Sequence, residues 1–313
     1  MTKIPNIFHF VFGLIPQTAP LHLMHYLCLA SCLEVNKPEK IYFHYQHLPY
    51  GEWWDRIAPH ITLCKVTNSN FIETFEYKNK AVEIFRYAHI SDIIRLEVLL
   101  KYGGVYADMD TLFVKKIPDT LYLHDCVMGK EMVNWQETMA QKAGGSLCNA
   151  FIMAAPQSVF IQQWLQEIHQ YFDGSWSGHS TFLPYILSQK PEAAVHVEPQ
   201  SSFFHFGWNK KGIHNLFMNH PLHREDIYSM HLWAHLWWSY SRTDFSYFSH
   251  LELTPAYVAF ANTTYATIAK QFLPGDIFTT RQQYEQERKR FARKHLWLHT
   301  KSRLKNALRK ITF

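Results

Sequence analysis

Two aspartates separated by a single residue, Asp108 and Asp110, are the residues whose type and spacing best suit chemistry. They follow Val105-Tyr106-Ala107, an apolar run typical of a short buried strand. In a regular strand, side chains at positions i and i+2 point to the same face. Two carboxylates so placed suit Mg²⁺ or Mn²⁺, which bind oxygen ligands and stabilise charge on a departing phosphate. An isolated pair of this kind is also common in exposed turns, so the surrounding sequence must decide.

Four charged residues lie in a predicted helix that precedes this pair. At about 100° per residue, Asp92 and Arg95 share one face, while Glu97 and Lys101 lie roughly opposite. We assign Glu97 and Lys101 to solvent. Asp92 and Arg95 then point inward among Ile, Leu and Val side chains, where unpaired charges are unfavourable. They must bind each other or a polar ligand, and a structural salt bridge is the alternative to a ligand site.

The elements around these residues form an alternating series. Ser91 is a candidate cap for the start of the helix, and Gly103 with Gly104 predicts its end at a left-handed cap. Upstream, hydrophobic patterning predicts one helix and three strands, in the chain order Ile4–Gly13 (strand), Leu21–Glu34 (helix), Lys40–Tyr45 (strand) and Ile61–Val66 (strand). This alternation predicts an α/β protein with a mostly parallel sheet.

The composition indicates a compact globular protein. The chain has 313 residues, of which 47% are hydrophobic and 16% aromatic, enough to bury a sizeable core. It contains no long apolar run, and Met1 to Gly13 lacks the order of a signal peptide. Its five cysteines form no CxxC pair, so neither a disulfide framework nor a cysteine zinc site is indicated. We therefore expect reduced cysteines and a cytoplasmic protein.

Positive charge is concentrated at the C-terminus. Residues 281–313 hold 11 of the 31 Lys and Arg but only 2 of the 26 Asp and Glu. Apolar residues recur there at helical spacing, namely Trp297, Leu304, Leu308 and Ile311. The pattern predicts a basic amphipathic helix suited to an anionic membrane surface, although a solvated helix or a nucleic-acid arm has the same pattern. We divide the chain into a domain at 1–280 and this tail at 281–313.

The central segment resembles a known family. It has a Ser-Asp-x-x-Arg helix, a Tyr-Gly-Gly stop and a Tyr-x-Asp-x-Asp strand, in this order, within Ser91 to Asp110. This pattern resembles the DXD sugar-transferase family of the yeast initiating α-mannosyltransferases and the globotriaosylceramide synthases, and more distantly the large clostridial glucosylating toxins. Ile4 to Gly13 is similar to the family's opening strand, and Cys148-Asn149-Ala150-Phe151 to its later Asn-Ala segment.

The resemblance implies a glycosyltransferase of the GT-A fold, an α/β architecture. It implies a nucleotide-sugar donor, with a UDP-sugar favoured, a carbohydrate or lipid-linked glycan acceptor, Mn²⁺ or Mg²⁺ on Asp108 and Asp110, and usually retention of the anomeric configuration. Asp92 and Arg95 would hydrogen-bond the hydroxyls of the donor sugar, with Asn149 close to the transferred sugar. The other implied donor-binding residues are His9, Phe12, Gly13, Tyr106 and Asp108. Phe12 stands where the family usually has Trp.

A histidine- and tryptophan-rich segment, from His231 to Trp238, is similar to the family's C-terminal His-x-Trp-Ala-x-Ser-Trp segment. That segment closes over the diphosphate, so the resemblance implies His231 as a third metal ligand and the indole N–H of Trp237 as a donor to the diphosphate. Leu236 replaces the family's serine. The alternative is an aromatic helix packed in the core, since the leucines and tryptophans also fit i,i+4 spacing.

Two other functions remain open. Asp108-Met109-Asp110-Thr111-Leu112 resembles the motif of haloacid-dehalogenase-type phosphohydrolases, but Leu112 stands where that family has Thr or Val. A non-catalytic carbohydrate-binding protein with a degenerate donor site is the third possibility. We expect the transferase, no nucleic-acid partner, and a location at the inner face of a bacterial membrane, where the protein would build a surface polysaccharide or a lipid-linked glycan.

Overall fold

The computed structural model describes residues 3–66, 74–77, 80, 83–221, 225–239 and 246–311, and it describes side chains as far as Lys301. Contacts group the chain into two compact units. The first unit comprises Met1–His205 and Asp226–His231, and the second comprises Phe206–Glu225 and Leu232–Phe313. The division that we predicted at residue 281 stays a prediction.

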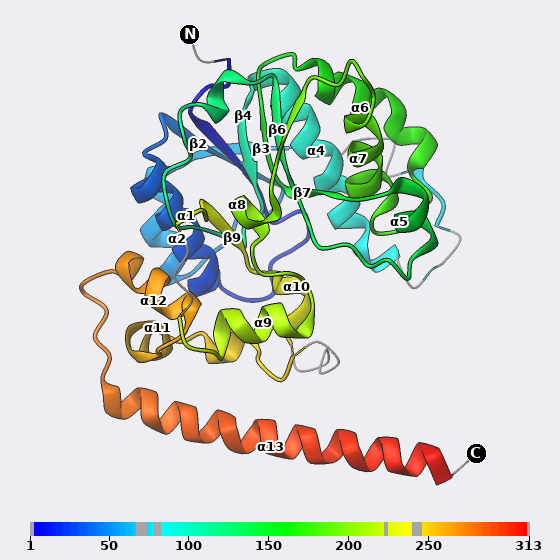
Figure 1. Cartoon of the computed structure of the whole chain (residues 1–313). Helices are drawn as coiled ribbons and strands as arrows, with labels where there is room; N and C mark the ends of the chain where they lie inside the picture. Colours follow the sequence, from blue (N-terminus) through cyan, green and yellow to red (C-terminus); the bar gives the residue numbers. More distant parts are fainter. Residues whose placement is uncertain are drawn as a thin grey trace. The chain divides into compact units, whose positions relative to one another are not determined.

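The centre of the first unit is a seven-stranded sheet with the order β3-β2-β1-β4-β7-β6-β8 (Figure 1). Neighbouring strands are parallel except where β7 pairs with β4 and β6. The strands are β1 (Ile7–Val11), β2 (Lys40–Tyr45), β3 (Thr62–Lys65), β4 (Gly104–Ala107), β6 (Cys126–Lys130), β7 (Leu147–Ala154) and β8 (Val195–Glu198). The mostly parallel α/β sheet expected for a GT-A-type fold is therefore confirmed.

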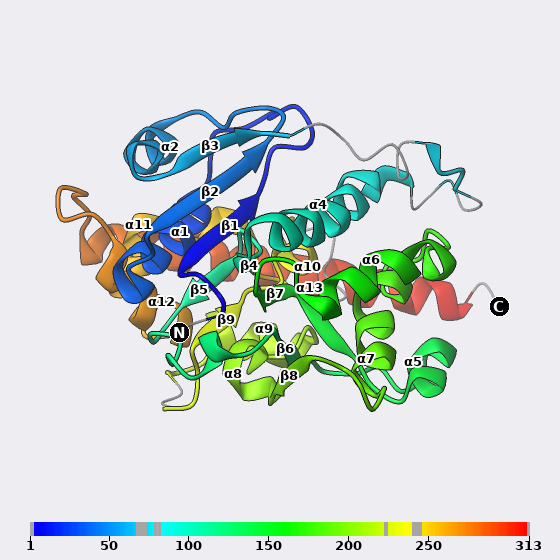
Figure 2. The same cartoon turned by 90° about the horizontal axis from the view of Figure 1, so that it is seen from above.

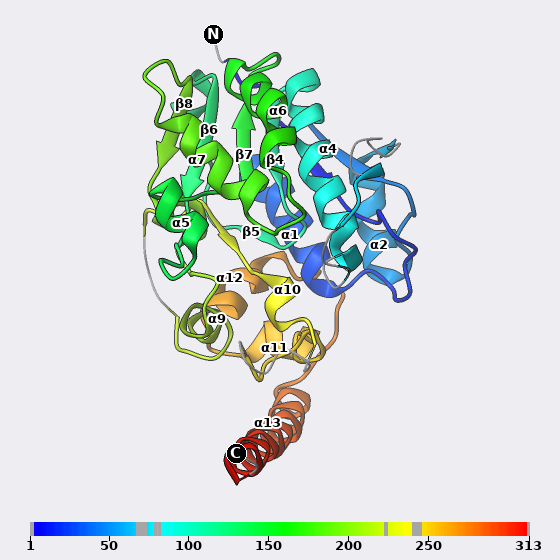
Figure 3. The same ribbon diagram turned by 90° about the vertical axis from the view of Figure 1, so that its right-hand side faces the viewer.

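Helices cover both faces of this sheet. The helices of the first unit are α1 (Leu23–Asn36), α2 (Glu52–Ile57), α4 (Arg86–Tyr102), α5 (Thr138–Ala143), α6 (Val159–Tyr171), α7 (Leu183–Ser188) and α8 (Gln200–Phe204). Short turns of helix are η1 (Ala58–His60), η2 (Glu83–Phe85), η3 (Leu121–Leu123) and η4 (Gly178–Phe182). The helices α4, α6 and α7 lie together beside β4, β6 and β7 (Figure 3).

Alternation along the strands separates two apolar layers. Tyr106 and Ile152, which pair across β4 and β7, belong to the core under α4 and α6. Side chains one position away point to the opposite face. There Phe113 contacts both Phe8 and Phe151, with ring centroids 5.6 and 6.4 Å apart. Phe113 belongs to β5 (Thr111–Phe113), which lies with α1 on this second face (Figure 2).

A second, two-stranded sheet positions the candidate site. Strand β5 pairs antiparallel with β9 (Ser229–His231), and Thr111 lies opposite His231. Because β5 begins directly after Asp110, this pairing brings the end of β9 beside the aspartate pair. Residues that are far apart in the sequence thus meet at one turn.

The second unit is helical. Its helices are α9 (Lys210–Phe217), α10 (Ala234–Trp237), α11 (Pro255–Phe260), α12 (Thr264–Ala269) and α13 (Arg281–Ile311), with short turns η6 (His250–Glu252) and η7 (Lys270–Phe272). The rings of Phe217, Trp237, Phe248 and Tyr265 pack together, with Phe217 stacked on Phe248 at 4.6 Å. Helix α13 begins at Arg281, as the sequence predicted. Among the described residues, no helix has both the length and the apolar composition needed to cross a bilayer.

The predicted boundaries are close to those observed, with one exception. The strands at β1, β2 and β3 and the helix α1 appear where the sequence placed them. Helix α4, however, begins at Arg86, so Ser91 lies inside the helix and does not cap it. The helix ends at Gly103 as predicted, but not with the left-handed cap that we expected, because Gly103 combines a φ of 64° with a ψ of −166°. A positive φ favours glycine, and a Cβ atom there would lie 2.7 Å from the nitrogen of Pro156. The side chains of Leu304, Leu308 and Ile311 lie outside the described residues.

Candidate functional site

The aspartate pair lies in the turn between β4 and β5. Strand β4 ends at Ala107, and the amide N–H of Asp108 donates to the carbonyl oxygen of Ala150 on β7 at 2.9 Å. The N–H of Thr111 then donates to the carbonyl of Asp108 at 3.0 Å, which closes the turn. We expected strand alternation to align the two carboxylates. The strand ends too early for that, and the turn brings them together instead.

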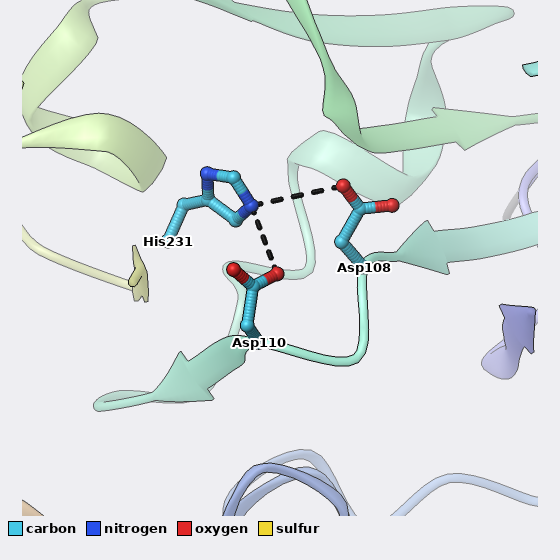
Figure 4. Close-up of side chains that lie close together, drawn as sticks. All are labelled: Asp108, Asp110 and His231. Atoms are coloured by element: carbon cyan, nitrogen blue, oxygen red, sulfur yellow. Dashed lines mark ion pairs between the residues drawn. The ribbon is translucent and has the colours of Figure 1, made fainter. Parts of the chain in front are cut away.

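The imidazole of His231 lies between the two carboxylates (Figure 4). Its Nε2 atom is 3.0 Å from Oδ1 of Asp110 and 3.6 Å from Oδ2 of Asp108. One ligand atom from each of the three residues lies within 4.8 Å of the others. Two carboxylates and an imidazole are ligand types that suit a divalent cation such as Mn²⁺, and Mg²⁺ is favoured less by the nitrogen ligand. The chemistry of these side chains therefore fits the metal that the family resemblance implies.

The two carboxylates determine the charge of His231. Burial on its own lowers the pKa of the imidazole, but Asp110 and Asp108 outweigh this effect and raise the pKa of His231 to about 10. At neutral pH without a metal, the ring therefore carries a proton that neutralises part of the carboxylate charge. A bound cation would replace that proton, since a histidine ligand must be deprotonated.

Asp92 and Arg95 point inward from α4, as predicted, and form a salt bridge. Nη2 of Arg95 lies 3.0 Å from Oδ1 of Asp92, and both side chains are almost completely buried. Nη1 of Arg95 also donates to the carbonyl of Asn149 at 2.7 Å, and it lies 3.5 Å from Oδ1 of Asp108. The pair is thus part of a network that reaches the aspartate turn, which an isolated structural salt bridge would not do.

Asn149 and Tyr106 complete this network. The amide of Asn149 donates to Oδ1 of Asp92 at 2.8 Å. The hydroxyl of Tyr106 donates to Oδ1 of Asp108 at 2.6 Å, and the guanidinium carbon of Arg95 lies 4.6 Å from the centre of the Tyr106 ring. Of the predicted residues, the structure therefore brings together Asp92, Arg95, Tyr106, Asp108, Asp110, Asn149 and His231.

The charge of Asp92 is also fixed by its neighbours. Burial raises the pKa of its carboxyl, but Arg95 and a hydrogen bond from His179 more than compensate and hold the pKa below its ordinary value. Asp92 is therefore ionised at neutral pH and accepts hydrogen bonds. The sequence analysis missed His179, whose Nε2 lies 2.9 Å from Oδ2 of Asp92. One histidine among twenty, at a separation of 87 residues, left no signal that sequence patterns could find.

The predicted residues of the opening strand have other surroundings. His9 is completely buried, and its ring nitrogens lie 3.0 Å from Nε2 of His44 and 2.9 Å from the carbonyl of Gly103. Phe12 is half-buried against His25, with ring centroids 4.9 Å apart. Gly13 has a φ of 70° and no room for a side chain. Donor binding by these three residues stays a prediction, and contact with His9 would require one of its internal bonds to open.

Trp237 lies within the second unit. It is completely buried, and its indole N–H donates to the carbonyl of Leu232 at 2.5 Å. Its ring packs against Phe217 at 4.7 Å. These contacts agree with the alternative of an aromatic core helix. The role at the diphosphate stays a prediction, and it requires the indole to exchange its present partner.

Comparisons with known proteins find a family model that matches part of the chain and relatives that are similar in sequence. Residues 30–128 match the glycosyltransferase sugar-binding region containing the DXD motif. The chain is 33% identical over 240 residues to Glucan organizing enzyme 1 of the fungus Cryptococcus neoformans. The alignment covers 74% of this chain and 63% of that protein. A stretch of 84 residues is 33% identical to Subversion of eukaryotic traffic protein A of Legionella pneumophila, covering 27% of this chain and 12% of that protein. The chain thus spans less than two thirds of the length of either relative.

Among solved structures, the chain is similar to the galactosyltransferase LgtC in complex with donor and acceptor sugar analogues. The sequence identity is 16% and the TM-score 0.44, and the similarity covers 90% of this chain and 99% of that one.

Proposed function

We propose that the protein is a metal-dependent glycosyltransferase, on the premise that residues 30–128 match the DXD-containing sugar-binding region of glycosyltransferases. Its donor is a nucleotide sugar, with a UDP-sugar favoured, and its acceptor is a carbohydrate or a lipid-linked glycan. The family resemblance supports transfer with retention of the anomeric configuration. We propose bacterial surface polysaccharide synthesis as the setting, although one of its relatives, Glucan organizing enzyme 1, is fungal.

The convergence of two polar groups on Asp108 supports this proposal most strongly. One group, Arg95 with Asp92 and Asn149, is suited to the hydroxyls of a sugar. The other, Asp110 with His231, is suited to a cation. When bound there, a divalent cation supplies positive charge to a diphosphate leaving group. A nucleotide sugar is a ligand that carries both a sugar and a diphosphate, the two kinds of group that these side chains suit.

The residues of the chain would divide the work of binding between them. Asp92, which is ionised, accepts hydrogen bonds from sugar hydroxyls, while the guanidinium of Arg95 donates to oxygen atoms. The side-chain amide of Asn149 donates to Asp92, and its backbone carbonyl accepts from Arg95. Asn149 therefore holds Asp92 and Arg95 in place relative to each other. Tyr106 orients Asp108 through its hydroxyl. Fixed donors and acceptors of this kind lower the barrier because they need no reorganisation during transfer.

Thermal-shift screening of UDP- and GDP-linked sugars, with and without Mn²⁺, tests this proposal. A bound donor stabilises the folded state by mass action, so we expect a shift that requires both the metal and the correct nucleotide. Release of the free nucleotide then measures slow hydrolysis, and anomeric NMR of the product tests retention. A screen in which no nucleotide sugar shifts the melting temperature would argue against the proposal.

A phosphohydrolase of the haloacid dehalogenase type fits the geometry less well. That chemistry needs a free nucleophilic carboxylate at Asp108. Here Oδ1 of Asp108 accepts from Tyr106, and Oδ2 lies 3.6 Å from His231. Hydrolysis of an aryl phosphate at a rate above that of nucleotide-sugar turnover would favour the phosphohydrolase instead.

We further propose that α13 binds an anionic membrane surface. One face of the helix packs within the second unit, where Phe291 is buried and His295 lies 2.8 Å from Glu252. On the remaining surface, Leu296 and Trp297 are 69% and 57% exposed. Cations lie within about two turns of them along the helix, at Arg290, Arg293, Lys294 and Lys301. Aromatic and basic side chains together favour the interface of an anionic bilayer.

Vesicle sedimentation tests this location. Each basic residue near an anionic surface contributes about 1 kcal/mol, so Arg293→Gln/Lys294→Gln should weaken binding to phosphatidylserine vesicles about tenfold or more. The matched control, Lys116→Gln/Lys142→Gln, removes two exposed cations elsewhere and should bind as the parent does. The binding should weaken as salt rises. Equal loss in both variants, or preference for an oligonucleotide over vesicles, would contradict the membrane role.

A further inference from the structure

His179 is a buried polar residue that the proposed chemistry leaves without a role. It lies in η4, a π-helical turn, and none of its surface is exposed. Its carbonyl oxygen accepts the indole N–H of Trp164 at 2.9 Å, which fixes the backbone of the turn. Its Nε2 is directed at Oδ2 of Asp92 at 2.9 Å. Both its backbone and its ring are thus held in one orientation against α4.

Among the described residues, three side chains contact the carboxylate of Asp92, and His179 differs from the other two. Arg95 and Asn149 both bind Oδ1. Arg95 also lies 3.5 Å from Oδ1 of Asp108 and donates to the carbonyl of Asn149, so both residues are connected to the aspartate turn. His179 alone binds Oδ2 among the described residues. A carboxylate has about four sites for hydrogen bonds. The described residues use three of them, and the bond from His179 to Oδ2 constrains the orientation in which the carboxylate can accept a further hydrogen bond.

The hydrogen bonds behind His179 are consistent with one tautomer. If Nε2–H of His179 donates to the carboxylate, its Nδ1 is an acceptor, and in the described part of the chain this buried atom has no hydrogen-bond partner. The neighbouring ring of His89 lies 5.2 Å away, edge to face. The hydroxyl of Tyr77 is 2.6 Å from Nδ1 of His89. If this hydroxyl donates, Nε2 of His89 carries the ring's proton, and this atom has no hydrogen-bond partner among the described residues.

We propose that His179 is a positioning residue of the transfer reaction, which orients the Asp92 carboxylate toward the donor sugar through its Nε2–H. The inference rests on the proposed function, since it assumes that Asp92 contacts the sugar. It assigns to His179 an effect on the transferred sugar and none on the metal, because its ring contacts Asp92 and not Asp108, Asp110 or His231. Substitution of a residue that only fills the core would not affect the sugar and leave the metal unaffected.

A matched pair of variants separates the hydrogen bond from the packing. His179→Gln keeps an N–H donor, whereas His179→Met has a similar shape and lacks the donor. We expect kcat for nucleotide-sugar turnover to fall about 10- to 100-fold in His179→Met, as for other residues that orient a ligand-binding side chain, and within about fivefold in His179→Gln. The dissociation constant of UDP measured with Mn²⁺ should change by less than about twofold in both variants.

The outcomes are decisive in either direction. Equal kcat values for the Gln and Met variants, with the parent active, would overturn the role of His179 and leave the proposed function intact. Loss of UDP and Mn²⁺ binding in step with kcat would overturn it too, as would failure of both variants to fold, because packing then accounts for the residue. A parent protein that turns over no nucleotide sugar rejects the proposed function, and the role of His179 falls with it.

Discussion

His9 and His231 are both buried in the first unit, but at neutral pH His9 is neutral and His231 is positively charged. Burial lowers the pKa of both rings. For His9 it dominates, and the pKa falls to about 4, with the ring held between His44 and the carbonyl of Gly103. For His231 two carboxylates outweigh burial and raise the pKa to about 10. Burial of a histidine therefore says little about its role, and the charges that face it say much more.

The two histidines also differ in what their ring nitrogens contact. Both ring nitrogens of His9 have partners in the protein, namely Nε2 of His44 on β2 and the carbonyl of Gly103 at the end of α4. His9 therefore links β1 to these two elements. The carboxylates around His231 are partly exposed, and the proton on the ring balances part of their negative charge. A cation can exchange with that proton. We expect this second region to respond to ligands and the first to respond only to unfolding.

The largest effect should follow from removing the carboxylates. Asp108→Asn and Asp110→Asn each lose a charged metal ligand but keep the size of the side chain. We expect either change to reduce nucleotide-sugar turnover by at least about 100-fold and to abolish its Mn²⁺ dependence, since the metal provides most of the charge for the leaving group. Activity and circular dichroism of the purified variants are the measurements. Turnover within about twofold of the parent, with metal dependence unchanged, would refute the site.

The sequence predicted much of this site because its patterns are local. The inward face of α4 follows from helical periodicity, and the stop at Gly103 from a backbone conformation that favours glycine. The aspartate pair is a motif of adjacent residues. His231 was reached only through a family resemblance, because pairing of β5 with β9 joins residues 120 positions apart. His179 was missed entirely, since no pattern encodes a contact between a π-helical turn and α4.

Trp237 shows the limit of the resemblance. Its role and that of His231 were both inferred from one segment, His231 to Trp238, which is similar to the family's C-terminal segment. The structure places His231 in the first unit beside the carboxylates, while Trp237 lies in the second with its N–H donated to Leu232. A motif specifies which residues occur together, whereas the strand that ends at His231 determines which of them reaches the turn.

Alanine substitutions at the two histidines, His231 and His9, should have different effects. His231→Ala removes the nitrogen ligand, and we expect Mn²⁺ affinity to fall about 10- to 100-fold. In a chelator the melting temperature should also fall by roughly 5 °C, because the charged ring that faces the two carboxylates is lost. His9→Ala leaves His44 and the Gly103 carbonyl without their buried partner, so the free energy of unfolding should fall by about 2–3 kcal/mol with Mn²⁺ affinity unchanged. Calorimetric titration and urea unfolding measure the two quantities. If His9→Ala weakened the metal and His231→Ala did not, the assignment of the two regions would be reversed.

The smallest expected effect is the pH dependence of stability without metal, which has opposite sign at the two histidines. In the unfolded chain both rings titrate near about 6.5. The pKa of His9 is lowered to about 4 and that of its partner His44 to about 3, so the unfolded state binds protons first and stability is lost as the pH falls from about 6.5 toward 4. The pKa of His231 is raised to about 10, so its contribution is complete below about 6.5 and is lost as the pH rises toward 10. Melting temperatures measured in a chelator should therefore peak near neutral pH and fall by roughly 5 °C on either side. His44→Gln should flatten mainly the acid side and His231→Gln mainly the alkaline side, and a curve whose alkaline side was unchanged in His231→Gln would show that the carboxylates do not hold a proton on this ring.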